Sequence, residues 1–337
     1  MSLLAVFNLL ITEDQVRNYI IRRLLQLVPL LLIISFFIFI TLSLTGNSLR
    51  SLLTSNPRIT AETITKLERI YGMDKPLLVR FVYWFKAFFT GEWGYSREYH
   101  DAVLVLIKAR MPVTLALMGL SFLISIVVAI PIGIYSALKQ YSFLDYAATA
   151  LAFFGMAMPV FWFGLMLMLL FGVKLGWLPL GGYSSQGMDT ASLFMRFLDH
   201  LKYLIMPAIV LGLQEMASWT RYTRSSMLEV LRMDYVRTAR AKGLSERTVI
   251  YKHALRNALI PIITLLMLAI PGLFGGAVLT ETVFSISGIG RLLYTAITTS
   301  DTFLSMGTLM VLAILVVIFN FAADLLYAIA DPRIKYS

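Results

Sequence analysis

The residues of this chain that could carry chemistry are few and scattered. His100, His200 and His253 lie far apart, and none has a partner at metal-ligand spacing. There is no cysteine, which excludes a thiolate nucleophile, a disulfide framework and a cysteine metal site. The sequence contains neither a Gly-x-Ser-x-Gly elbow nor the Gly-x-x-x-x-Gly-Lys-Ser/Thr loop that cradles nucleotide phosphates. We therefore expect no catalytic residue, no metal and no cofactor in this chain.

Polar side chains inside long apolar stretches are the remaining candidates. Gln214 and Glu215 interrupt one stretch, Glu281 closes another and Asp324 lies near the end of the last. A charge in hydrocarbon costs about 2.5–3.5 kcal/mol on insertion scales, so Glu215 should face the bundle or pair with Arg221. These residues are candidates for a translocation pathway or gate, and hydrogen bonding between helices is the alternative. The carboxylates lie towards the ends of their stretches, which argues against a proton-coupled carrier.

Composition assigns the chain to the integral membrane proteins. Of its 337 residues 58% are hydrophobic and 14% are charged, with a mean hydropathy of +0.78. Soluble domains carry about 25% charged residues. The net charge of +10 would suggest nucleic acid in a soluble protein. Here the basic residues flank apolar stretches, so membrane topology and anionic lipid explain them and no nucleic-acid partner is expected.

The apolar stretches predict an all-α polytopic protein with six transmembrane helices in one domain, residues 1–337. The spans cover residues 24–44, 112–138, 146–171, a run from 203 that ends at Gln214, 257–280 and 303–330. Residues 1–23 form a cytoplasmic or interfacial N-terminus. Residues 45–110 form a large extracytoplasmic insert with a helix over 59–71 and an amphipathic interfacial helix over 77–89. The distribution of basic residues predicts that both termini are cytoplasmic.

The most distinctive polar segment is residues 221–256, between the fourth and fifth spans. It carries nine basic residues, namely Arg221, Arg224, Arg232, Arg237, Arg240, Lys242, Arg247, Lys252 and Arg256. Apolar residues recur at helical spacing on both sides of Lys242-Gly243-Leu244-Ser245. Glycine permits the left-handed residue that ends a helix, and serine is a good N-cap. We predict a cytoplasmic loop of two helices joined at Gly243. The alternative is that the basic residues reflect only the preference of cytoplasmic loops for Lys and Arg and have no further role.

The fifth span carries the sequence features of a bending helix. Pro261 and Pro271 fall inside it, and Gly272 and Gly276 are spaced i, i+4. Small residues at this spacing let a neighbouring helix approach closely. We therefore expect the segment around Pro271, Gly272 and Gly276 to line the pathway.

Several stretches resemble one family of membrane proteins. The segment 235–246, YVRTARAKGLSE, followed by HALRNALIP at 253–261, resembles the cytoplasmic loop of permease subunits of type I ABC importers. Ala239 and Gly243 fit the Glu-Ala-Ala…Gly pattern of that loop, whereas Arg237 and Thr238 stand where Glu and Ala would be. This variant resembles the dipeptide/oligopeptide/nickel branch. Similar matches occur at 19–29, 71–77, 91–96, 278–292 and 323–333.

The resemblance implies a complex whose motor lies outside this chain. It implies a second, related permease subunit, two ABC ATPase subunits that bind ATP and Mg²⁺, and an extracytoplasmic substrate-binding protein, in a bacterial or archaeal plasma or inner membrane. Four residues would contact the ATPase beside Ala239 and Gly243, namely Leu244, Ser245, Glu246 and Arg247. The substrate stays open among dipeptides, oligopeptides, glutathione, oligosaccharides and chelated nickel. An ATPase-independent secondary transporter or channel is the alternative function, and an intramembrane enzyme lacks any paired catalytic motif.

Overall fold

The computed structural model describes residues 13–45 and 75–330, and within them every regular element is a helix. The helices are α2 (Glu13–Thr45), α5 (Leu77–Thr90), α6 (Val103–Leu138), α7 (Phe143–Ala157), α8 (Val160–Leu167), η1 (Met168–Lys174), η2 (Met188–Thr190), α9 (Leu193–Leu231), α10 (Asp234–Ala241), α11 (Glu246–Thr248), η3 (Val249–Leu255), α12 (Arg256–Val283), α13 (Ile289–Thr298) and α14 (Thr302–Ala330). The helix predicted over 59–71 lies outside the described residues.

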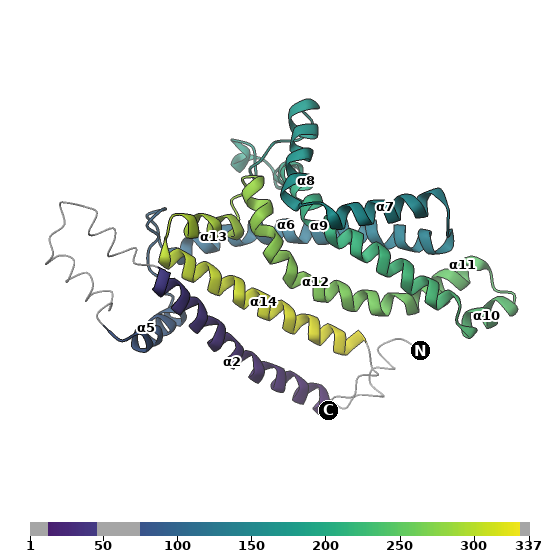
Figure 1. Cartoon of the computed structure of the whole chain (residues 1–337), viewed down its shortest axis with the longest axis horizontal. Helices are drawn as coiled ribbons and strands as arrows, with labels where there is room; N and C mark the ends of the chain where they lie inside the picture. The colour runs from purple at the N-terminus through teal and green to yellow at the C-terminus, as the bar shows by residue number, and fades with distance from the viewer. Residues whose placement is uncertain (1–12, 46–74, 331–337) are drawn as a thin grey trace.

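The long helices pack lengthwise into one bundle. α6 runs along α9, and α9 also contacts α7 and α12. α12 packs against α14, which in turn packs against α2. Figure 1 shows α10 and α11 at one end of the bundle, α5 and α13 at the opposite end, and α8 standing away from it. The basic segment of the sequence therefore forms one end of the molecule.

Length and composition identify up to five membrane spans among the described residues. Three are single helices, Ile20–Leu44, Val103–Leu138 and Thr302–Leu325. Two are bent pairs, Phe143–Ala157 with Val160–Lys174 and Glu246–Leu259 with Pro261–Phe274. α9 is not among them, although its 39 residues extend ~58 Å at 1.5 Å per residue. Its second half carries Glu215, Arg221 and Arg224.

The predicted span over 146–171 is broken rather than continuous. The chain turns by 112° between α7 and the α8–η1 pair. Pro159 has no backbone N–H and disfavours a helical conformation of the preceding residue, and Met158 is extended, with φ −80° and ψ 130°. Within α8 and η1 only Gly164 is buried. The second part of this span is therefore held by few contacts within the chain.

Two helices begin earlier than their apolar stretches. α6 begins at Val103 rather than near 112, and α9 begins at Leu193 rather than near 203. Hydropathy marks the part of a helix that lies in hydrocarbon, whereas backbone hydrogen bonding continues through polar residues such as Lys108 and Arg196. The additional turns extend the helices beyond the predicted spans.

Small residues bring α6 and α9 into close contact. A Cβ added to Gly212 of α9 would lie 2.3 Å from the Ser125 hydroxyl of α6. A Cβ added to Gly133 of α6 would lie 2.6 Å from the Thr223 side chain of α9. Apolar lipid gives helices in a membrane no hydrophobic reason to associate, so this close backbone packing stabilises the pair. The contact determines the position of α9, from which the basic segment continues.

The helix predicted over 77–89 forms as α5, and its aromatic side chains hold it to α2. Phe81 packs edge-on against Phe36 and Phe39 of α2, at centroid distances of 5.2 and 5.7 Å. α5 ends at Gly91, which has φ 80°. No residue of α5 is buried in the chain, as is typical of a helix that lies in the membrane interface.

A bidentate ion pair joins α7 to α9. Arg224 Nε and Nη2 donate to the two Asp145 carboxylate oxygens at 2.7 and 2.9 Å. The Asp145 side chain is 4% exposed and that of Arg224 is 29% exposed. The Tyr141 N–H also donates to Asp145, and Ser142 caps the helix at the Asp145 N–H. The start of α7 is thereby fixed to the side of α9.

Replacing Asp145 with Asn should destabilise the protein measurably. The substitution leaves the Arg224 charge without its partner in a mostly buried position. We expect the free energy of unfolding to fall by about 3 kcal/mol. This value is at the lower end of the range for a broken buried ion pair, because Arg224 keeps some contact with water. The measurement is thermal unfolding of the purified protein in detergent.

The matched control is Asp234→Asn, which removes a pair with Arg237 whose side chains are 96% and 73% exposed. That change should leave the melting temperature nearly unaltered. Equal effects of the two substitutions would contradict a stabilising role for the Asp145–Arg224 pair.

Candidate functional site

The segment 221–256 folds into a compact projection at one end of the bundle. It comprises the end of α9, then α10, α11 and η3. A small apolar cluster attaches it to three long helices, and the cluster consists of Ala137 of α6, Met227 of α9, Val236 and Ala239 of α10, Val249 and Ala254 of η3, and Ala258 of α12. A force on the projection is therefore applied to α6, α9 and α12 together.

The turn between α10 and α11 is a Schellman motif. The Gly243 N–H donates to the Arg240 carbonyl at 2.9 Å, and the Leu244 N–H donates to the Ala239 carbonyl at 3.4 Å. Gly243 has φ 76°, a conformation that residues with a Cβ rarely adopt. The turn occurs at the glycine that the sequence predicts, and it satisfies carbonyls at the end of α10.

Two polar interactions hold the other side of the turn. The Ser245 hydroxyl accepts from the Thr248 N–H at 3.4 Å, so Ser245 is the N-cap of α11 as predicted. Arg240 Nη2 and Nε donate to the Glu246 carboxylate at 2.8 and 3.2 Å. The hydrogen bond to Glu246 raises the pKa of the Arg240 guanidinium above its ordinary value. The pair closes the turn from α10 to α11.

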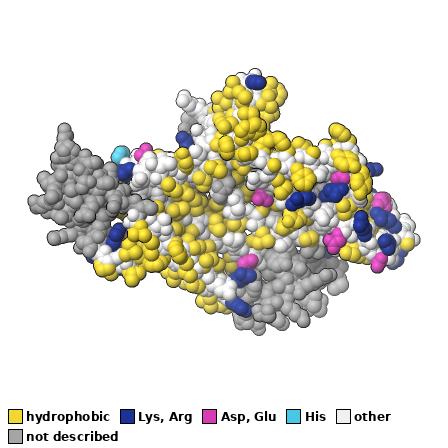
Figure 2. All heavy atoms as spheres, in the orientation of Figure 1, with side chains coloured by type: hydrophobic (Ala, Val, Ile, Leu, Met, Phe, Trp, Pro, Cys, Tyr) yellow, Lys and Arg dark blue, Asp and Glu magenta, His cyan; other side chains and the backbone are white. Residues whose placement is uncertain are grey.

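Five of the six residues predicted to contact an ATPase lie on the surface of this projection. Leu244 is 41% exposed, and Gly243, Ser245, Glu246 and Arg247 are also exposed. Ala239 is buried in the cluster beneath them. Figure 2 shows Lys, Arg, Asp and Glu side chains gathered at this end of a largely hydrophobic surface. An exposed leucine among charges on a rigid turn suits a docking contact.

The carboxylate of Glu281 is surrounded by protein groups, unlike a side chain that lines a solvent-filled gate. It is fully buried at the end of α12. The Thr114 hydroxyl of α6 donates to its Oε1 at 2.6 Å, and the Arg291 N–H donates to its Oε2 at 2.9 Å. Thr114 in turn accepts from the Ile289 N–H at 2.8 Å. Glu281 and Thr114 together accept hydrogen bonds from N–H groups in the first turn of α13. A negative charge at this position also stabilises the N-terminal end of the helix.

The glycines after the fifth span serve this contact. A Cβ added to Gly288 would lie 2.2 Å from Glu281 Oε1, and one added to Gly290 would lie 2.6 Å from the Val278 backbone. Gly288 is extended, with φ −99° and ψ −175°, so space rather than backbone conformation requires glycine there. Gly288 and Gly290 allow α13 to approach the end of α12.

The other pathway candidates are not gathered into one site. Gln214 is exposed on α9, and half-buried Glu215 forms no ion pair with Arg221 among the described residues. Asp324 forms an ion pair with Arg23 of α2 at 3.2 Å, at the end of α14 opposite to the one near Glu281.

One glycine of the predicted face of the fifth span, Gly272, has no neighbour among the described residues. Pro271, Gly272 and Gly276 lie within α12, which continues to Val283. A bend of 44° falls between Leu259 and Pro261, at the first of the two prolines predicted to bend this span. A Cβ added to Gly272 would meet nothing within 4 Å, so the close approach that this glycine permits is not used by a described helix.

Three buried carboxylates that organise the structure were missed from the sequence. Besides Asp145, Asp199 accepts from the Ser185 N–H and hydroxyl, both at 2.7 Å. Asp301 accepts from the Ser96 hydroxyl at 2.6 Å and the Arg97 N–H at 2.7 Å. Each carboxylate fixes a loop to a long helix. Asp301 precedes α14 and accepts from the Leu304 N–H, so an N-cap search would have found that position but not its distant partners.

The chain matches one protein family along most of its length. Residues 129–336 match the family described as "Binding-protein-dependent transport system inner membrane component", and residues 16–118 match the description of its N-terminal part. The chain belongs to this family. It is thus a membrane component of a transport system, and the family resemblance inferred from residues 235–261 and the other matching motifs is confirmed.

Relatives match the chain almost from end to end. The oligopeptide transport system permease protein AppB of Bacillus subtilis is 41% identical over 94% of this chain and 99% of that protein. The dipeptide transport system permease protein DppB of Alkalihalophilus pseudofirmus is 39% identical over the same shares. The di/tripeptide transport system permease protein DppB of Pseudomonas aeruginosa is 40% identical over 83% of this chain and 86% of that protein.

A solved structure supports the fold. A chain of the MetNI methionine ABC transporter, determined in inward-facing conformations, aligns with a TM-score of 0.52 at 18% identity. The alignment covers 67% of this chain and 96% of that one. At this identity the likeness concerns the fold alone.

Replacing Glu281 with Gln should loosen α13 without unfolding the bundle. Glutamine retains one acceptor oxygen, but its NH₂ group replaces the other. Either the Thr114 hydroxyl or the Arg291 N–H therefore loses its acceptor. Leaving such a buried donor unpaired costs about 1–3 kcal/mol of stability. We expect faster amide hydrogen exchange over 288–298 and little change in α6.

The control is Thr298→Val in the same helix, which removes only an exposed hydroxyl that donates to the Tyr294 and Thr295 carbonyls. Its exchange pattern should match that of the unmodified protein. Unchanged exchange in Glu281→Gln would contradict the proposed capping of α13.

Proposed function

We propose that this chain is the membrane-spanning permease subunit of an ATP-driven peptide importer, in which it forms half of the translocation pathway. The observation that carries the proposal is the 41% identity to an oligopeptide permease over 94% of this chain and 99% of that protein. The dipeptide and di/tripeptide permeases among the relatives support the same substrate class. The proposed cargo is therefore di- or oligopeptides, and the chain itself is a transport component rather than a catalyst.

The proposed topology has six spans. α9 is the fourth, and the broken α7–α8–η1 segment is the third. Both termini and the 221–256 projection would be cytoplasmic, and residues 45–110 would form the extracytoplasmic insert. This orientation is supported by the charge of the 221–256 segment. The ion pair between Arg23 and Asp324 supports the placement of both termini on one side of the membrane, because it brings the first half of α2 beside the end of α14.

The proposed partners are a second permease, two ATPases that bind ATP and Mg²⁺, and an extracytoplasmic binding protein. The projection around Gly243 would dock on one ATPase. Because the apolar cluster joins it to α6, α9 and α12, closure of the ATPases would move these helices as a unit and convert the cavity from inward- to outward-facing. Glu246 and Arg240 would keep the turn rigid enough to transmit that movement.

The decisive experiment reconstitutes the chain with its co-purified partners in liposomes. Peptide uptake and ATP hydrolysis would be measured together across dipeptides, longer peptides, glutathione and nickel chelates. The proposal expects uptake of peptides that requires ATP and the ATPase subunits. Uptake by the chain alone, with no ATPase present, would favour the secondary transporter or channel and contradict the proposal.

Gly243→Pro should uncouple ATP hydrolysis from transport. Proline is restricted to φ near −65°, whereas Gly243 has φ 76°, so the turn cannot keep its shape. We expect peptide uptake to fall at least about tenfold while the complex still assembles and hydrolyses ATP, because a misplaced turn loses at least one strong contact. The measurement is the ratio of peptide transported to ATP hydrolysed.

A matched control is Gly187→Pro, at a glycine of similar conformation, φ 78°, that also has no neighbour within 4 Å. It lies just before η2, away from the projection, and should leave the ratio unchanged.

A second variant separates docking from folding. Glu246→Arg should uncouple, and if the Arg240–Glu246 pair acts only by shaping the turn, adding Arg240→Glu should restore coupling.

A further inference from the structure

The second half of α9 carries a polar stripe that faces away from the rest of the chain. Gln214, Ser218, Arg221 and Ser225 follow one another at spacings of four, three and four residues, so they share one face of the helix. Gln214, Arg221 and Ser225 are exposed. The opposite face of α9 is buried and includes Trp219, Thr220, Thr223 and Met227. Three of its four residues are therefore left uncovered by the described part of the chain.

This face is unsuited to lipid. Gln214 ends the apolar run of α9, and Arg221 follows it at the start of the 221–256 segment, where polar residues beside a span face bundle interiors or water-filled cavities rather than lipid. Arg221 has no carboxylate partner among the described residues, and its guanidinium lies 5.9 Å from the Tyr222 ring centroid. In a permease, a polar face without a partner in its own chain suits the translocation pathway.

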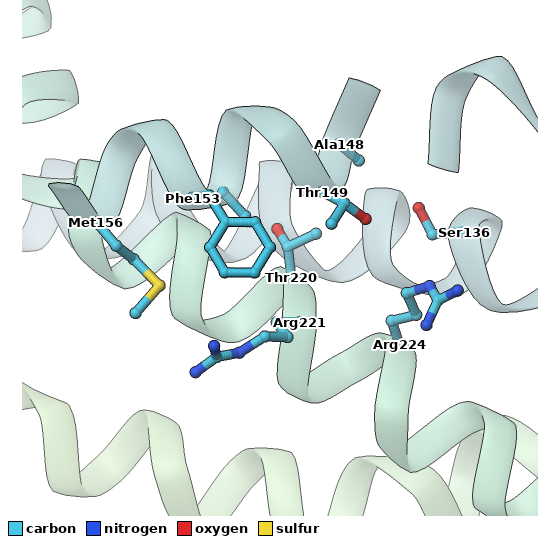
Figure 3. Close-up of a pocket in the computed structure, with 9 residues that line it drawn as sticks. Ser136, Ala148, Thr149, Phe153, Met156, Thr220, Arg221 and Arg224 are labelled. Carbon is cyan, nitrogen blue, oxygen red and sulfur yellow. The ribbon is translucent and has the colours of Figure 1, made fainter. Parts of the chain in front are cut away.

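A pocket of about 200 Å³ lies beside the stripe, between α7 and α9. Its walls are mostly apolar, and its lining consists of Ser136, Ala148, Thr149, Ala152, Phe153, Met156, Thr220, Arg221 and Arg224. Figure 3 shows Phe153 and Met156 on the α7 side, with the Arg221 side chain directed towards Met156 and that of Arg224 towards Ser136. An apolar wall and a cation thus meet at one end of the pocket.

Most polar groups of the lining are already engaged within the chain. Arg224 is held by Asp145. The Thr149 hydroxyl donates to the Asp145 carbonyl and the Thr220 hydroxyl to the Met216 carbonyl. Among the lining residues the buried Ser136 hydroxyl and the Arg221 guanidinium have no hydrogen-bond partner in the described part of the chain, and of these two Arg221 carries the charge. An arginine binds a carboxylate through two parallel hydrogen bonds.

We infer that this pocket is a subsite for the C-terminal residue of the transported peptide. This inference rests on the proposed function. Arg221 would bind the terminal carboxylate, and Phe153 and Met156 would contact the last side chain. The pocket volume suits one side chain rather than a whole peptide. Gln214 and Ser218, on the same face, would offer hydrogen bonds to the peptide backbone. The subsite would thereby orient the peptide on its path to the cytoplasm.

The test uses the full complex in nanodiscs and two peptides of one sequence. One carries a benzophenone amino acid as its C-terminal residue, and the other carries it at the N-terminus. After irradiation during turnover, the adducts are located by mass spectrometry. We expect the C-terminal probe to label the α7 segment that contains Phe153 and Met156, and the N-terminal probe to label it far less.

Arg221→Gln should reduce this adduct on the order of tenfold, the loss expected when a charge-assisted hydrogen bond is removed. Arg221→Lys should restore part of it. The control is Arg232→Gln, an exposed arginine at the end of α9 that does not line the pocket. It should leave the labelling unchanged.

Three results would overturn the inference: equal labelling by both probes, labelling that is insensitive to Arg221→Gln, or no α7 adduct while uptake proceeds. A lipid site is a separate outcome. For this outcome, a benzophenone lipid would label the pocket, and both omission of anionic lipid from the nanodiscs and Arg221→Gln would reduce that labelling. If the peptide probes also fail to label α7, Arg221 binds a lipid headgroup instead. Uptake of unlabelled peptide by the same samples tests the proposed function independently.

Discussion

The close contact between α6 and α9 is the constraint on which the rest of the structure depends. It is possible because Gly212 and Gly133 have no side chain where the opposing helix carries Ser125 and Thr223. Once α9 is held on that side, its other face becomes the polar stripe of residues 214–225, and its end leads into the basic projection. One tightly packed surface thus determines both where a solute could pass and where a motor could act. Both proposed roles would involve the same helix, α9.

Buried carboxylates perform a second task that hydrophobic packing cannot perform in a membrane. Lipid and protein interior are similarly apolar, so apolar contacts do little to decide which loop belongs beside which helix. A carboxylate must find donors once buried, because an unsatisfied charge is far more costly there than in water. Asp199, Glu281 and Asp301 each accept backbone N–H groups from one specific segment. They thereby determine the loop positions at the end of the bundle opposite the projection.

The sequence predicted features that arise from neighbouring residues and missed those that join distant ones. Gly243 and Ser245 were identifiable because a C-terminal glycine and an N-cap serine act within a few residues. The pairing of Asp301 with Ser96 spans 205 positions and that of Arg224 with Asp145 spans 79. No local pattern contains such pairs. Glu281 was noticed for its unusual position, but its contact with Thr114 requires the fold. Hydropathy predicted six spans, of which up to five have a candidate among the described residues, and it did not reveal that Pro159 divides one of them.

The pairing of α2 with α14 has a consequence for how the protein is made. α2 is the first helix of the bundle to leave the ribosome, and its main contacts are with α14, the last one, sealed by Arg23 and Asp324. Until synthesis is complete, α2 can only remain in lipid beside its early neighbour α5. The chain must therefore keep its first span stable as an isolated helix, which its long apolar run allows.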